Sequence, residues 1–267
     1  PMARGRSRSA SIAKTLSKIN EIVNSGINEI VLCGINVGDY GISNDESLLD
    51  LLKHLDEIAN LKRYRISSIE PNLLNKDIVK FISNSTKAMP HLHVPLQSGS
   101  DEMLRIMKRR YNVDDYKSLI NFINKSIPNI CIGVDVIVGH PNESNSLFNE
   151  TYNFLDKLDI SYLHVFSYSD RENTFSSSIN SKVSLEHKNL RRKKLQMLSN
   201  EKYKKFINKN LSTVKQVLFE NYNEGFIDGL SDNYIRVFAE GDAKLINSIK
   251  EVQITEHNIN TYGKIIN

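Results

Sequence analysis

The sequence has few of the residues that build redox centres. It contains no tryptophan and only two cysteines, Cys33 and Cys131, in 267 residues. Two isolated thiols cannot hold an iron–sulfur cluster, which takes three or four thiolates. Each cysteine lies in a short apolar run, so we expect both thiols to be buried and unreactive. Such cysteine usage fits a reducing, cytoplasmic compartment.

Long apolar runs are also absent. No stretch approaches the roughly 20 apolar residues of a membrane span, and no signal peptide is visible. The chain is 40% hydrophobic and 25% charged, which is typical of a soluble globular protein. Its net charge of +4 is compatible with nucleic-acid binding but does not indicate it alone. The length allows one large domain and a small one.

The most informative stretch runs from residue 91 to residue 111. Leu92, Val94 and Leu96 alternate with polar residues, which predicts a short strand. Pro95 ends the ladder of this strand because proline has no N–H to donate. The strand is therefore expected to stop close to a turn.

A turn and a helix start follow this strand. Ser100 is predicted to cap the helix. The carboxylates of Asp101 and Glu102 would stabilise the first turn by interacting with the positive end of the helix dipole. We expect the turn to leave backbone N–H groups free and to present the side chains of Gln97 and Ser98. Ligands of α/β proteins bind at this end of a strand, although an ordinary βα loop would show the same residues.

Helical and strand-like patterns alternate through the first 210 residues. They predict helices over 12–23, 48–58, 75–85, 100–109, 114–126, 147–158 and 183–208, and strands over 29–33, 64–69, 91–96, 130–139 and 162–166. The continuous apolar run at 29–33 predicts a strand buried on both faces. Five or six βα units of this kind predict an α/β fold, an open parallel barrel.

Polar residues follow several of these strands. A loop with three glycines contains Gly34, Asn36 and Asp39, and glycine lets the backbone approach a ligand closely. Glu70 ends the strand 64–69 directly before a proline, so it is a candidate site residue of a βα barrel. The alternative is that Glu70 caps the next helix.

Two further charged residues and one turn stand out. Asp135 interrupts an apolar run, and because an unpaired buried carboxylate is costly, it must have a partner, either a ligand or a neighbouring side chain. Arg171 follows the last predicted strand, where a guanidinium can grip carboxylate or phosphate, or is an exposed loop residue. Asn142 can adopt the left-handed conformation that the turn 139–143 requires.

The pattern changes to short strands after residue 211. Strands are predicted over 214–220, 225–230, 234–238, 252–256 and 263–266, which indicates a small antiparallel β-barrel and two domains, 1–210 and 211–267. The basic helix before the barrel carries Lys193 and Lys194. The apolar residues of this helix form one stripe, which consists of Leu190, Leu195, Leu198 and Phe206. Packing of this stripe on the rest of the protein would explain the helix without any RNA contact.

Several segments resemble one family. Pro95-Leu-Gln-Ser-Gly-Ser-Asp101 and Met107-Lys-Arg-Arg-Tyr111 are similar to the methylthiotransferases of the radical S-adenosylmethionine superfamily, most closely to the branch that modifies threonylcarbamoyladenosine in tRNA. Further matches, in the same order as in the family, are Arg4, Gly5 and Arg8 near the start, Ser68-Ile-Glu-Pro71, and Tyr168-Ser-x-Arg-x-x-Thr174. In the turn 139–143, His140 and Asn142 replace the family's aromatic residue and glycine.

The resemblance implies a fold, an activity and partners. The fold is a partial TIM-type barrel of the radical SAM kind, followed by a TRAM-like RNA-binding barrel. The activity is methylthiolation at C2 of N6-threonylcarbamoyladenosine next to the anticodon of tRNA. The family uses S-adenosylmethionine, two [4Fe-4S] clusters and an electron donor. The cluster cysteines are not in this chain and are expected before Pro1.

The resemblance also implies site residues, but no catalytic residue and no metal ligand. The expected cofactor-binding residues are Gly34, Asn36, Glu70, Gln97, Ser98, Asp135 and Arg171. Apart from the resemblance, the positive charge of Arg4, Arg8, Lys193 and Lys194 makes them the expected RNA-binding residues, with a solvated surface as the alternative. All but Asp135 follow predicted strands, so we expect Gly34, Asn36, Glu70, Gln97, Ser98 and Arg171 to meet at one mouth of the parallel barrel.

Two alternatives stay open. The chain can be a non-catalytic remnant that binds tRNA without cluster chemistry, or an ordinary metabolic βα-barrel enzyme, which would leave the order of motifs unexplained. A Cys-x-x-x-Cys-x-x-Cys encoded upstream of Pro1 would favour the enzyme, and a start codon at Met2 would favour the remnant. The oligomeric state and the tRNAs recognised do not follow from the sequence.

Overall fold

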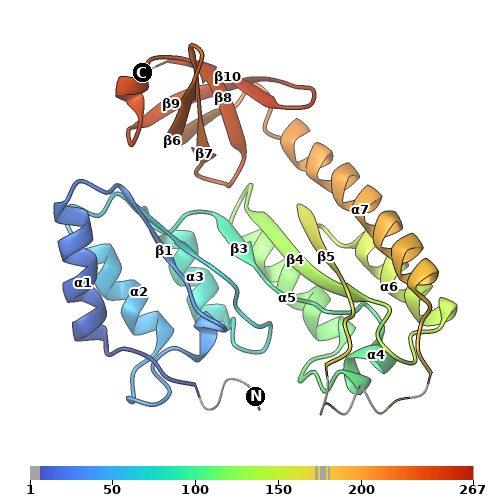
Figure 1. Cartoon of the computed structure of the whole chain (residues 1–267). Helices are drawn as coiled ribbons and strands as arrows, with labels where there is room; N and C mark the ends of the chain where they lie inside the picture. Colours follow the sequence, from blue (N-terminus) through green and yellow to red (C-terminus); the bar gives the residue numbers. More distant parts are fainter. Residues whose placement is uncertain (1–6, 172–173, 175–178, 180, 267) are drawn as a thin grey trace. The chain divides into compact units, whose positions relative to one another are not determined.

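The computed structural model describes residues 7–171, 174, 179 and 181–266 (Figure 1). The chain forms two compact units. Unit 1 comprises Pro1–Leu92, Ser126–Cys131 and Ile207–Asn267, and unit 2 comprises His93–Lys125 and Ile132–Phe206. Figure 1 shows strands and helices alternating up to the long helix α7, and almost only strands after it.

Unit 1 begins with a two-stranded parallel sheet and its helices. These elements are α1 (Ile12–Asn24), β1 (Glu29–Leu32), the short 3-10 helix η1 (Val37–Asp39), α2 (Leu48–Glu57), β2 (Arg63–Ile66) and α3 (Lys76–Asn84). Ser11, Ser47 and Asn75 begin the three α-helices, each accepting an N–H of the first turn. Asn75 caps α3, so the alternative that Glu70 caps it is wrong.

Unit 2 is built on the three-stranded sheet β3-β4-β5. Its elements are β3 (His91–His93), which starts in unit 1, then α4 (Asp101–Ile106), α5 (Val113–Ser126), β4 (Cys131–Val138), α6 (Asn145–Lys157), β5 (Tyr162–Ser167) and α7 (Leu185–Asn208). β4 and β5 are parallel. The helices close the core; Tyr116 of α5, fully buried, donates to the carbonyl of Val94.

The C-terminal strands form the closed barrel that the sequence predicts. They are β6 (Val214–Asn223), β7 (Phe226–Ser231), β8 (Arg236–Glu240), β9 (Ile249–His257) and β10 (Thr261–Ile265), in the order β10-β8-β7-β6-β9, with the short 3-10 helix η3 (Ala243–Leu245) before β9. All pairs are antiparallel except β10–β8, which is parallel. Val217, Phe219 and Ile254 are fully buried inside the barrel.

Four predictions about burial and capping are wrong. β1 has β2 as its one neighbour in the described chain, so Val31 is 50% exposed and Cys33 is exposed, whereas Cys131 is buried as expected. Leu190 is exposed, outside the buried stripe of α7. Ser100 occupies the N-cap position of α4, but its hydroxyl donates to Glu150 instead of capping the helix.

The described part of the chain has no helix that is both long and apolar enough to cross a membrane.

Candidate functional site

The loops after β1 and β2 bring Asn36 and Glu70 together within unit 1. The side-chain oxygen of Asn36 accepts the N–H of Glu70 at 3.4 Å, and its amide donates to Asp39 at 3.1 Å. The two residues follow neighbouring parallel strands, whose ends share one edge of the sheet. Asn36 therefore stands beside the half-buried Glu70, as the sequence predicts for these two residues.

Glycine is needed in this loop at a position that the sequence does not single out. A Cβ on Gly34 would make only ordinary contact with Val37, at 3.4 Å. A Cβ on Gly38 would lie 2.7 Å from the Cβ of Leu73, which is too close for any side chain. Gly38, rather than Gly34, thus lets the loop pack against the segment after β2.

The turn after β3 is tightly bonded inside unit 2. Gln97 has a left-handed φ of 72°, and its N–H donates to the carbonyl of Asp135 at 2.8 Å. Ser98 is fully buried with its hydroxyl 2.9 Å from that of Thr151, which also accepts the N–H of Gly99. The expectation of free N–H groups in this turn is therefore wrong at Gln97 and Gly99. The ligand-binding roles of Gln97 and Ser98 stay predictions.

Asp135, whose side chain is 21% exposed, has a partner. The Nε2 of His93 lies 2.8 Å from Oδ1 of Asp135, so the partner is a neighbouring side chain. His164 stands opposite Asp135 in the register of β4 and β5, and its ring centre is 5.5 Å from that of His93. Burial, reinforced by nearby His93, lowers the pKa of His164, and Asp135 opposes the shift. These three titratable side chains form one cluster on the β3-β4-β5 sheet.

Sequence reasoning missed the two histidines of this cluster. A usable signal was present, because His164 lies between Tyr162 and Phe166 at the two-residue spacing that puts strand residues on one face. His93 alternates with buried Leu92 and Val94 in the same way. The pairing of His93 with Asp135, 42 residues apart, depends on tertiary structure that spacing does not give.

The turn 139–143 is bound to α7 by an ion pair. Asn142 has a φ of 68°, which confirms that it adopts the left-handed conformation. Glu143 accepts the N–H of Gly139 and a guanidinium hydrogen of Arg191, each at 2.6 Å. Burial raises the pKa of Glu143, while the Gly139 N–H and Arg191 act against the rise. Arg191 is itself buried, so it is not available to a phosphate.

The expected RNA-binding cations differ in their surroundings. Arg4 lies outside the described residues, and Arg8 and Lys193 are exposed. Lys194 is exposed as well, with its ammonium 4.5 Å from the ring centre of Tyr152. Arg171 is exposed in the loop after β5, where its carbonyl accepts the hydroxyl of Thr174.

Charge is divided unevenly between α7 and the barrel. Helix α7 has eight Lys and Arg against two Glu, a net charge of +6. Residues 211–267 have five Lys and Arg against eight Asp and Glu, a net charge of −3. A polyanion is therefore attracted to α7 and repelled by the barrel.

Comparisons with known proteins agree on one superfamily. The family model "Radical SAM superfamily" matches residues 1–155. The chain is 35% identical over 261 residues to the threonylcarbamoyladenosine tRNA methylthiotransferase MtaB of Bacillus subtilis, covering 95% of this chain and 58% of that protein. It is 32% identical over 267 residues to the tRNA-2-methylthio-N(6)-dimethylallyladenosine synthase of Endomicrobium trichonymphae, covering 100% of this chain and 64% of that protein.

A solved structure supports the fold. Coproporphyrinogen III oxidase (HemN) from Escherichia coli, a radical SAM enzyme, superposes with a TM-score of 0.50 and 14% identity, covering 92% of this chain and 60% of that one. At this identity the likeness concerns the fold alone. The chain spans about 58–64% of the length of the curated relatives named above.

The superfamily implies S-adenosylmethionine and a [4Fe-4S] cluster, and the thiols of this chain do not fit the cluster. Cys33 is exposed after β1, and Cys131 is buried in β4. Among the described residues, no group of three His, Cys, Asp or Glu could hold a metal ion. Two thiols fall short of the three or four that a cluster takes.

The remaining features fit the superfamily well. Parallel strands alternate with helices, polar side chains follow the strands, and the family model covers more than half of the sequence. The chain therefore belongs to the radical SAM superfamily.

Proposed function

We propose that this chain is the core of a tRNA methylthiotransferase that acts on N6-threonylcarbamoyladenosine next to the anticodon. The observation that carries the proposal is identity of 35% and 36% to two threonylcarbamoyladenosine tRNA methylthiotransferases over 95% and 90% of the chain. The dimethylallyladenosine enzymes are 32–34% identical, so the preference between the two modified bases rests on a small margin.

In this proposal, loops that follow the parallel strands of the N-terminal 210 residues bind S-adenosylmethionine. The candidates are Gly34, Asn36 and Glu70 in unit 1, and Gln97, Asp135 and Arg171 in unit 2. Asn36 orients the loop that carries Glu70 through its bond to the Glu70 N–H. Ser98 acts indirectly, because its buried hydroxyl fixes the turn at Gln97 through Thr151.

In this proposal, the ligands of the iron–sulfur clusters are not residues of this chain. The two [4Fe-4S] clusters and the electron donor belong to the proposed whole enzyme, since two separated thiols do not supply a ligand set. When bound at such a cluster, S-adenosylmethionine supplies the radical of this superfamily. The residues of this chain bind and orient the reactants and bind tRNA.

The exposed cations of α7 are the proposed tRNA phosphate contacts, with Arg8 and Arg4 as further candidates. Arg192, Lys193 and Lys204 are exposed on α7, whereas Arg191 and Lys202 are bonded to protein groups. The TRAM-like barrel, with its net charge of −3, would contact RNA by means other than phosphate attraction.

A second candidate function is tRNA binding without methylthiolation. The observation that favours it is the lack of a thiolate set in this chain. It predicts tRNA affinity in a chain that holds no iron.

A chimaera separates the two functions. Whatever part of the Bacillus subtilis MtaB precedes the segment that this chain matches would be fused before Pro1, and the product reconstituted with iron and sulfide under anaerobic conditions. With S-adenosylmethionine, a reductant and tRNA bearing threonylcarbamoyladenosine, mass spectrometry should detect the 2-methylthio product. The Glu70→Gln chimaera, a control with full iron content, should lose most of the product. A chimaera that holds iron, cleaves S-adenosylmethionine and forms no product would contradict the proposed activity.

A further inference from the structure

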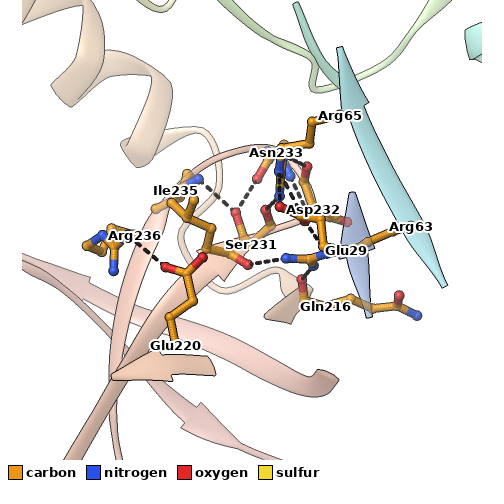
Figure 2. Close-up of polar contacts among 11 residues, drawn as sticks. Glu29, Arg63, Arg65, Gln216, Glu220, Ser231, Asp232, Asn233, Ile235 and Arg236 are labelled. Carbon is orange, nitrogen blue, oxygen red and sulfur yellow. Dashed lines mark hydrogen bonds and ion pairs between the residues drawn. The ribbon is translucent and has the colours of Figure 1, made fainter. Parts of the chain in front are cut away.

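Within unit 1, the barrel meets the β1–β2 sheet through three charged side chains (Figure 2). Glu29 and Arg63 stand opposite each other in the register of β1 and β2. Arg65 lies two residues further along β2, so it points to the same face as Arg63. The Nε atoms of Arg63 and Arg65 lie 2.5 and 3.1 Å from the Glu29 carboxylate, and the three side chains are at most 8% exposed.

Both guanidinium groups donate to backbone carbonyls of the barrel segment. Arg63 donates to Gln216 at 3.2 Å and Leu230 at 3.0 Å. Arg65 donates to Ser231 at 2.6 Å and Asp232 at 2.8 Å. Two cations share the Glu29 carboxylate, so the carbonyl dipoles of the barrel and, for Arg63, the nearby carboxylate of Asp232 supply the rest of the charge compensation.

The barrel turn that receives Arg65 is itself fixed by buried side chains. Ser231 and Asn233 are fully buried and bonded to each other, and Asn233 also donates to Asn210 and to the carbonyl of Asn129. Tyr234 stacks on His91, which begins β3, with ring centres 3.8 Å apart and planes 9° from parallel. The turn is thus bonded both to the barrel and to the segment before β4.

Removing the barrel contacts would leave buried charge without compensation. Burial lowers the pKa of Arg63, and Glu29 acts against this shift. A buried guanidinium that loses its acceptors keeps its desolvation cost. By contrast, the one arginine of the barrel, Arg236, is 41% exposed and pairs with Asp228 and Glu220 of the same barrel.

We propose that Glu29, Arg63 and Arg65 form a clamp that makes the C-terminal barrel a fixed structural part of the N-terminal half, so that the two unfold as one. Glu29 and Arg63 begin β1 and β2, and Arg65 is the third of the four residues of β2. Asn36 and Glu70 follow the ends of these strands, so the clamp and these loops are held by the same two short strands.

Hydrogen exchange of the full chain tests the clamp without any ligand. Peptides from β1–β2 and from β6–β8 should lose protection at the same denaturant concentration in the unaltered protein, because one event exposes both. Two separate denaturant midpoints for these peptides would overturn the proposal.

Substitutions then locate the coupling. Arg65→Met should lower the Tm by about 10 °C and raise exchange in β1–β2 and in the barrel together. Arg65→Lys keeps the positive charge but loses the forked donor geometry of the guanidinium, so it should lower the Tm by less and raise exchange in the same two regions. This variant replaces Arg65→Met in the test if Arg65→Met fails to fold. The matched control Arg236→Met should lower the Tm by no more than about 3 °C. Faster exchange in only one of the two regions, or in neither, would overturn the proposal.

Discussion

Helix α7 and the C-terminal barrel differ in charge, although both were expected to contact RNA. The helix has a net charge of +6 in 24 residues, and residues 211–267 have −3. The expectation for the barrel came from its architecture, and that for the helix came from its lysines. The net charge of the whole chain, +4, conceals the division. Architecture and electrostatics therefore assign phosphate contacts to different regions, and electrostatics favours the helix.

The two regions also use their arginines differently. Arg191 of α7 is buried against Glu143 and Asn145, so it holds the helix to the turn after β4. Arg236 of the barrel is 41% exposed, and its two acidic partners neutralise it. Neither arginine is free for RNA, so the exposed residues of α7, such as Lys193, carry the phosphate prediction.

The largest expected effect comes from the buried arginine. Arg191→Met leaves the Glu143 carboxylate buried without its cation, and this should lower the free energy of unfolding by about 3–5 kcal/mol. The control Lys193→Met, on the exposed side of the same helix, should change it by no more than about 0.5 kcal/mol. Urea unfolding of both variants measures the difference. Equal stability of the two variants would show that the ion pair does not anchor α7.

A smaller effect is expected from the acidic barrel. Replacing three exposed glutamates, Glu224, Glu240 and Glu256, by glutamine brings the net charge of residues 211–267 from −3 to zero. Because these carboxylates repel a polyanion, tRNA affinity should rise by roughly threefold to tenfold at low salt. A fall in affinity would mean that these carboxylates make contacts that tRNA needs.

The smallest effect is a loss of stability at mildly acid pH. Burial lowers the pKa of His140 below the ordinary 6.5, and partial desolvation lowers that of His164, which is exposed and therefore contributes less. As the pH falls through 6.5, the unfolded chain therefore binds protons before the folded chain does, and stability is lost until the folded pKa values are reached. Both histidines belong to unit 2, so its amides should exchange faster between pH 7.5 and 5.5, while barrel amides, corrected for the intrinsic effect of pH, should change less. Constant stability of unit 2 over this range would contradict the predicted shifts.

The sequence predicted local structure well because the signals are local. Helical and strand periodicities placed the main elements within a few residues, and Asn142 was expected to be left-handed because of its intrinsic tolerance. The need of Asp135 for a partner also followed from the cost of burial. Each of these predictions depends on a residue and its near neighbours in the chain.

Exposure and long-range pairing could not be predicted in this way. An apolar run does not say how many strands surround it, so Cys33 was expected to be buried and is exposed. The bond of Ser98 to Thr151 joins residues 53 positions apart, and that of Arg65 to Ser231 joins residues 166 apart. The division of the chain into domains at residue 211 and the ligand roles of the loop residues stay predictions.

The salt dependence of tRNA binding tests the central claim, the assignment of phosphate contacts to α7, most directly. The full chain would be titrated with tRNA from about 50 to 200 mM salt, beside a variant with Arg192, Lys193, Lys204 and Lys205 changed to glutamine. The account predicts a steep fall of affinity with salt for the unaltered chain. For the variant it predicts weaker binding and a slope of log affinity against log salt smaller by about 3–4 units, since each of the four lost phosphate contacts removes about 0.7–0.9. Equal slopes for the two proteins would contradict the account.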